Sequence, residues 1–254
     1  METQYIDITK SLGKDFYVAS RLPLGFFEFD GNDELFDCIT GKESQLTEIL
    51  EPLYDAVVKE KYDTHSQLNY LYNTGRVRFE NLYSNAHRFY NLLSDDLFRD
   101  EPVIKRFKEF LKESLWEYSS LFEKAPEAIW VRPWINILDR WEYLQIHSHT
   151  SLYVCDSTQG VTFCCGYDLS IPKPETYTLY GPIYNEFTLF NEEHVTGEFQ
   201  KENSNGHLTC FPSFLPHTTS PNKSTQKRYT IAMDVITTYD QYHLHKRHGI
   251  FCQL

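Results

Sequence analysis

Three histidines in the C-terminal half of the chain have the residue type and spacing of metal ligands. His147 and His149 lie in an extended stretch between Tyr143 and Tyr153. Residues i and i+2 of a strand point to the same face, so this pair would present two imidazoles together. Imidazole suits Fe, Cu, Zn and Ni. For the pair alone, a surface strand that happens to carry two histidines is an equally good interpretation.

A third histidine and an arginine favour the metal site. His217 ends an apolar stretch that begins at Cys210 and turns at Pro216, far along the chain from the first pair. Arg228 follows and opens the apolar strand Arg-Tyr-Thr-Ile-Ala-Met-Asp-Val. An arginine buried in such a strand requires an anionic partner, and its guanidinium fork matches a carboxylate. The alternative is an arginine at the strand edge with its head in solvent.

Short strands separated by turn residues are predicted after Pro126, and these would have to position the histidines. The predicted strands are Ile129–Leu138, Tyr143–His149, Ser151–Cys155, Val161–Tyr167, Leu208–Phe214 and Tyr229–Thr237. Strands at this spacing are typical of an antiparallel sandwich or barrel. The polar segment from about 173 to 205 is long enough for a lid or an extra hairpin.

The N-terminal part has mainly helical patterns after one or two strands in its first 40 residues. Helices are predicted for Glu43–Tyr62, within 64–93, and for Val103–Phe122, which Pro102 opens. We expect one domain over 1–254: mainly helical bracing and substrate entry in 1–125, a jelly-roll core with the metal site in 126–240, and a tail in 241–254.

Composition excludes some partners. The net charge of −12 and the lack of a basic face disfavour nucleic acid. An acidic balance favours a small-molecule substrate, amino-acid-like and cationic compounds included. The six cysteines show no disulfide framework and predict buried thiols in a reducing compartment. No signal peptide or membrane span is visible, so a cytoplasmic protein with no membrane partner is expected, and its oligomeric state stays open.

The chain resembles the 2-oxoglutarate/Fe(II)-dependent oxygenases, in particular a group with a His-x-His strand and a Phe-Pro-Ser-x-x-x-His corner. The matching stretches are Trp134–Asn136, Gln145–His149, Gly206–His217 and Arg228–Thr230. This resemblance implies a fold that is mainly β with α, a double-stranded β-helix (jelly roll, cupin-like) braced by N-terminal helices. It also implies Fe(II) at His147, His149 and His217, and 2-oxoglutarate at Arg228 and Thr230, with O₂ as cosubstrate. Trp134, Asn136, Tyr143 and Tyr153 would line the substrate pocket.

One residue departs from the family pattern. Most members have Asp or Glu where this chain has His149. Asp156 is a weaker candidate for the missing carboxylate, because it would point to the opposite face of a regular strand. The resemblance implies hydroxylation of an unactivated C–H bond with release of succinate and CO₂. The alternatives are a three-histidine, cupin-like dioxygenase that does not use 2-oxoglutarate, and a non-catalytic jelly-roll protein.

Overall fold

Two long neighbouring strands give the large sheet its two different faces. β3 (Ala128–Leu138) pairs with β10 (Arg228–Thr238) along the full length of both. Because alternate residues point to opposite faces, one face of β10 carries Arg228, Thr230 and Asp234. Its other face carries apolar side chains, namely Tyr229, Ile231, Met233 and Val235. The alternation therefore separates a polar inner face from an apolar outer face.

The computed structural model describes residues 1–13, 16–42, 92–93, 97–122, 126–144, 147–149, 163–181, 195–196, 199–238 and 252–254. Its remaining elements are β1 (Glu2–Gly13), β2 (Phe16–Glu28), α1 (Asn32–Thr40), α5 (Pro102–Ser119), β4 (Phe163–Ser170), β5 (Tyr177–Tyr180), β6 (Val195–Thr196), β7 (Phe199–Glu202), β8 (His207–Pro212), β9 (His217–Thr219) and β11 (Cys252–Gln253). The described strands form one sheet in the order β11-β3-β10-β4-β8-β2-β1-β6 and another in the order β7-β5-β9.

The strand pairs are nested, first with last, as in a jelly roll. β3 pairs with β10, the segment His147–His149 bridges to β9, β4 pairs with β8, and β5 pairs with β7. β10 also pairs with β4, and β9 with β5, so the nested pairs alternate between the two sheets. Two antiparallel sheets connected in this way make a double-stranded β-helix. The predicted fold is confirmed.

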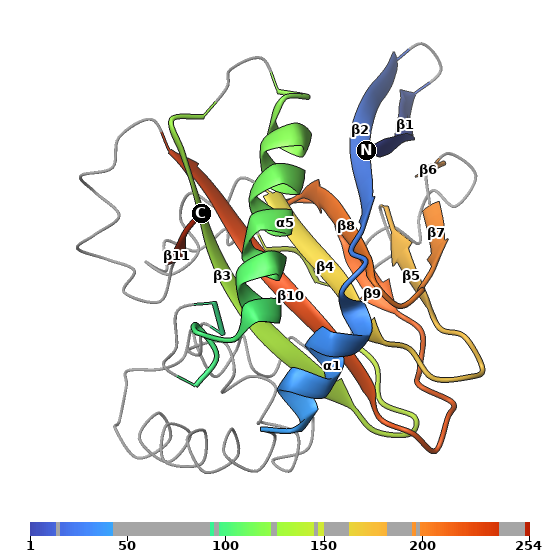
Figure 1. The fold of residues 1–254 in the computed structure, drawn as a ribbon. Coiled ribbons are helices and arrows are strands. Elements are labelled where there is room, and N and C mark those ends of the chain that lie inside the picture. Colours follow the sequence, from blue (N-terminus) through green and yellow to red (C-terminus); the bar gives the residue numbers. More distant parts are fainter. Residues whose placement is uncertain are drawn as a thin grey trace, which may run out of the picture.

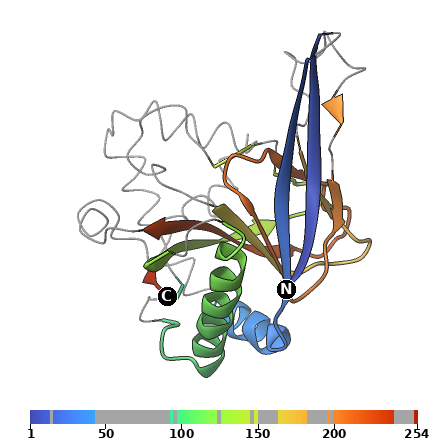
Figure 2. The ribbon, with the colours of Figure 1, turned by 90° about the horizontal axis from the view of Figure 1, so that it is seen from above.

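Two helices cover the apolar outer face of the large sheet (Figures 1 and 2). α5 begins at Pro102, a residue favoured in the first helical turn. It buries one stripe of side chains at helical spacing: Val103, Ile104, Phe107, Leu111, Leu115 and Tyr118. α1 adds Leu35 and Ile39, one turn apart. These side chains share one apolar cluster with the outward residues of β3, β4, β8 and β10. The helices therefore brace the sheet from behind and leave its polar face to the cavity.

The N-terminal region adds strands to the large sheet. β1 and β2 form a long hairpin, and β2 pairs with β8 (Figure 2). The predicted strands before the helices are thus confirmed, as is the helix Val103–Phe122, which α5 closely matches. The predicted helices Glu43–Tyr62 and within 64–93 lie outside the described residues, apart from a turn at 92–93. The region 1–125, predicted to be mainly helical, therefore also extends the large sheet through its strands at 2–28.

The cysteine side chains agree in part with the prediction. Cys164 and Cys165 pack into different apolar clusters on opposite faces of β4, so they are not a bonded pair. Cys38 is only partly buried and packs against the edge of the main apolar cluster, whereas Cys164, Cys165, Cys210 and Cys252 are buried. Cys155 lies outside the described residues. Among the described helices, none is both long and apolar enough to cross a membrane.

Candidate metal centre

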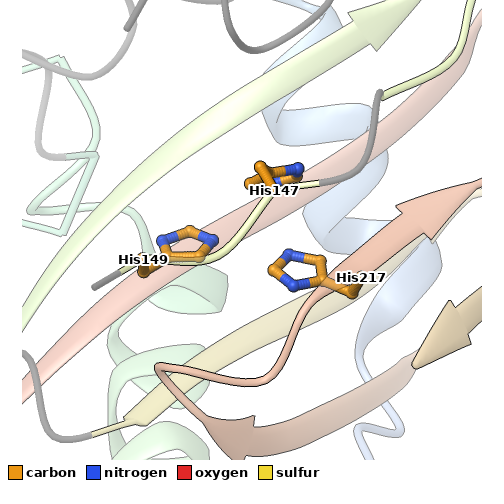
Figure 3. Close-up of side chains that lie close together, drawn as sticks. All are labelled: His147, His149 and His217. Atoms are coloured by element: carbon orange, nitrogen blue, oxygen red, sulfur yellow. The ribbon is translucent and has the colours of Figure 1, made fainter. Parts of the chain in front are cut away.

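The three predicted histidines converge in a cavity lined by residues of both sheets (Figure 3). A ligand nitrogen of each of His147, His149 and His217 lies within 4.8 Å of those of the other two. The ring centroids are 4.2 Å apart for His147 and His217, and 5.2 Å apart for His149 and His217. Three imidazole nitrogens at this spacing form one face around a metal-sized space.

Backbone hydrogen bonds hold the His147–His149 segment against the Phe-Pro-Ser corner. The His147 N–H donates to the His217 carbonyl (3.0 Å), and the His217 N–H donates to the His147 carbonyl (2.9 Å). The His149 N–H donates to the carbonyl of Ser213 (2.8 Å). The Phe-Pro-Ser corner therefore has a structural role in the site. It fixes the two ligand-bearing segments to each other, and the i, i+2 spacing directs both side chains of the segment toward His217.

The ring of His217 is prepared for a metal by a second hydrogen bond. Its Nδ1 lies 3.0 Å from the carbonyl oxygen of Leu215. A carbonyl can only accept, so Nδ1 carries the proton and Nε2 keeps its lone pair. Burial, together with His147 and His149, holds the pKa of His217 well below its ordinary value. The ring is therefore neutral, as a metal ligand must be.

His149 is oriented by a buried carboxylate. Its Nδ1 lies 2.6 Å from Oδ1 of Asp234, whose other oxygen accepts from Arg132 Nη2. Burial on its own would raise the pKa of Asp234, but Arg132 and His149 outweigh it and hold that pKa well below the usual value. Asp234 is therefore ionised and accepts a hydrogen bond from the Nδ1–H of His149, which leaves Nε2 available to a metal.

Arg228 is buried at 2% exposure in the same cavity and has a carboxylate neighbour. Its Nη2 lies 3.9 Å from Oδ1 of Asp168, whose Oδ2 is 2.8 Å from the Nζ of Lys201. Burial lowers the pKa of Arg228, and Asp168 opposes that effect. Within the described part of the chain, Nε and Nη1 of Arg228 have no hydrogen-bond partner. Buried donors of this kind indicate a missing acceptor.

The other predicted residues are placed as follows. Thr230 lies two residues from Arg228 on the inner face of β10, and its hydroxyl is 3.5 Å from Nδ2 of Asn136. Trp134 lies with its ring centroid 5.8 Å from that of His149. All three line the cavity.

The prediction that Tyr143 lines the pocket is wrong. Its side chain is 43% exposed, while Leu144 lines the cavity. Leu144 is held by Thr219, whose hydroxyl accepts from the Leu144 N–H (2.9 Å). Neighbouring residues of an extended segment point opposite ways, so anchoring Leu144 inward turns Tyr143 outward. Tyr153 and Asp156 lie outside the described residues.

The sequence interpretation missed Asp234, Arg132, Asp168 and Lys201. One signal could have found the first two. Arg132 and Asp234 are opposite charges in two apolar strands, each on the face that also carries the polar residues Asn136 and Thr230. Opposite charges on neighbouring strands pair when they face each other, but only the register shows that they do. Asp168 and Lys201 come from strands whose approach the sequence does not reveal.

No protein-family model matches the chain, and no curated protein matches its sequence. Solved structures are similar to it. One is an oxidoreductase of the 2OG-Fe(II) oxygenase family from Burkholderia pseudomallei, 11% identical, with 54% of this chain and 59% of that chain covered and a TM-score of 0.39. The match thus spans less than two thirds of that protein's length.

Two further structures are similar at the same level. A prolyl-4-hydroxylase from Pseudomonas putida is 12% identical, with 55% of this chain and 68% of that chain covered and a TM-score of 0.38. The non-heme alpha-ketoglutarate-dependent carbocyclase SnoK from nogalamycin biosynthesis is 10% identical, with 50% and 62% covered and a TM-score of 0.35. The strand pairing of the chain itself, and not these similarities, defines its fold.

Proposed function

We propose that the chain is a non-haem Fe(II) and 2-oxoglutarate-dependent oxygenase. It would oxidise, most simply by hydroxylation, an unactivated C–H bond of a small molecule and release succinate and CO₂. One observation carries the proposal. A single cavity contains three converging imidazoles and, on its wall, a buried guanidinium with two donors that lack partners among the described residues. The first group suits a transition metal and the second suits a carboxylate.

The donor set fits Fe(II). His147, His149 and His217 would hold the ion, and the hydrogen bonds to Asp234 and Leu215 already fix the tautomers of His149 and His217 that ligation needs. When bound, Fe(II) would couple two reactions: the O₂-dependent decarboxylation of 2-oxoglutarate and the oxidation of a substrate C–H bond.

The residues around Arg228 fit one carboxylate. Arg228 and Lys201 carry two positive charges and Asp168 one negative charge, so this buried cluster is left with one positive charge. A single carboxylate that accepts from Nε and Nη1 of Arg228 would satisfy both unpaired donors and neutralise the cluster. The Thr230 hydroxyl lies beside it as a further donor.

The remaining wall would orient the substrate and exclude water. Trp134 and Phe211 present ring surface beside the histidines, and Asn136 offers an amide. A small molecule is the proposed substrate class, amino-acid-like and cationic compounds included, because the net charge of −12 disfavours polyanions. A cytoplasmic location belongs to the proposal, since Fe(II) and free thiols both suit a reducing compartment.

One observation favours a second candidate, a three-histidine dioxygenase that does not use 2-oxoglutarate. Arg228 already has an anionic neighbour in Asp168, so its burial does not strictly require a cosubstrate. Asp168 is an incomplete partner for Arg228, however. Its Oδ1 lies 3.9 Å from Nη2 of Arg228, too far for a hydrogen bond, and its Oδ2 is closer to Lys201. The first candidate therefore explains more of the structure.

Metal-dependent stabilisation by 2-oxoglutarate tests the proposal. A ligand that binds only the folded protein adds about 2.7 kcal/mol of stability at a concentration 100 times its dissociation constant. We expect 2-oxoglutarate to raise the melting temperature of Mn(II)-loaded protein and to have much less effect in the presence of a chelator, because the ketoacid needs the metal. Glutarate, which has the same chain length and both carboxylates but lacks the keto group, is the matched control. Metal binding without any 2-oxoglutarate effect would support the second candidate. No metal binding would leave a non-catalytic jelly-roll protein.

A further inference from the structure

Asp234 is the buried carboxylate closest to the histidine face among the described residues of the cavity region. It is 1% exposed and lies on β10, directly opposite Arg132 on β3. Its two oxygens have separate partners. Oδ2 accepts from Arg132, and Oδ1 accepts from His149 Nδ1 at 2.6 Å. The thiol of Cys164, opposite on β4, is 3.7 Å from Oδ1.

The ion pair with Arg132 does not account for both contacts. If Asp234 served only to neutralise Arg132, both of its oxygens could face the guanidinium fork, which is the stronger arrangement. One oxygen is instead turned to the histidine. A carboxylate on the far nitrogen of a ligating imidazole fixes its tautomer and raises its basicity toward a metal.

The charge that three neutral histidines offer a metal ion is a second reason to assign a role to Asp234. Three neutral imidazoles bring no negative charge to a divalent cation, whereas two histidines and a carboxylate bring one. We propose that Asp234 supplies this charge indirectly, through the Nδ1–H of His149, and acts as the positioning residue that sets the metal affinity of the site. This inference rests on the proposed function only in taking the three histidines as the metal face.

The test is metal affinity, measured without 2-oxoglutarate or turnover. Anaerobic Fe(II) competition with a chromophoric chelator gives the dissociation constant of each variant. Asp234→Asn keeps the size and an acceptor oxygen but removes the charge. We expect it to weaken Fe(II) binding about 10- to 100-fold, the range for loss of a residue that supports a metal ligand.

Two companion variants separate a metal role from a folding role. Asp234→Asn removes the carboxylate that is ion-paired with the buried Arg132, which can prevent folding. The double variant Arg132→Gln/Asp234→Asn replaces the ion pair with a neutral amide pair and should fold, yet it should show the same loss of affinity. Arg132→Gln alone keeps the carboxylate and removes the competing cation. It should bind Fe(II) at least as tightly as the wild-type protein.

A charge exchange gives a positive readout. The variant His149→Asp/Asp234→Asn moves the carboxylate from position 234, which hydrogen-bonds to the ligand, to position 149, which is the ligand itself. We expect this variant to recover most of the affinity that Asp234→Asn loses, although its fold contains one hydrogen bond fewer. A purely structural role for Asp234 predicts no recovery.

The outcomes are distinct. Wild-type affinity in the double Arg132/Asp234 variant, an equal loss in Arg132→Gln alone, or no recovery in the charge exchange would each overturn the inference. If the affinities follow our expectation but wild-type protein binds no 2-oxoglutarate, the inference holds and the proposed function fails. If 2-oxoglutarate binds to the metal-loaded protein but Asp234→Asn keeps full affinity, the proposed function holds and the inference fails.

Discussion

His217→Ala is expected to abolish stoichiometric Fe(II) binding. His217 is the ligand from the opposite segment of the cavity, and without it only the neighbouring pair His147 and His149 remains on one side of the ion. Losing a ligand should cost more than the ~10–100-fold typical for a residue that only supports one. His147→Ala should behave in the same way. Calorimetry or chelator competition under anaerobic conditions measures the affinity.

The control is another histidine of the same chain. His207, at the start of β8, does not line the cavity, so His207→Ala should bind Fe(II) as the wild-type protein does. Melting curves recorded in chelator show whether each variant is folded without metal. A folded His217→Ala variant with wild-type affinity would remove that residue from the metal face.

Arg228→Ala is expected to raise the apparent 2-oxoglutarate dissociation constant by about one to two orders of magnitude. Hydrogen bonds to charged groups contribute roughly 1.5–3 kcal/mol each, and ~1.4 kcal/mol is tenfold in affinity. Fe(II) affinity should barely change, because the guanidinium is not a ligand. Arg228→Lys should fall between the two, since an ammonium keeps the charge and loses the planar fork. Calorimetry on Mn(II)-loaded protein gives the constants.

The neighbouring residue provides the matched control. Lys227 is an exposed cation next to Arg228 on the chain, so Lys227→Ala removes the same charge outside the cavity. Its 2-oxoglutarate constant should equal that of the wild-type protein. If Arg228→Ala also binds the cosubstrate as wild type does, the carboxylate anchor lies elsewhere in the cavity.

The strongest periodic patterns could be predicted from the sequence. β3 and β10 are long, largely apolar runs, and α5 has a proline start and a full apolar stripe. The small sheet was harder to predict. β5, β7 and β9 are short and lie among polar or turn residues, where local preference is weak and pairing decides the structure.

The candidate site was predictable where the chemistry lies in one short motif. The i, i+2 spacing of His147 and His149 and the corner before His217 both carry local signals, and the structure brings these residues together. Asp234 and Asp168 carry no such signal. Each is a single carboxylate inside an apolar strand, and its partners Arg132 and Lys201 are distant in the chain. Strand register, a tertiary property, determines these contacts.

Anaerobic visible spectroscopy with Fe(II) and 2-oxoglutarate tests the central claim most directly. A ketoacid that chelates Fe(II) produces a weak charge-transfer band that neither component gives alone. We expect the band only when protein, Fe(II) and 2-oxoglutarate are all present, and we expect it to be lost in His217→Ala. Stoichiometric Fe(II) binding by wild-type protein with no band at millimolar 2-oxoglutarate would contradict the account.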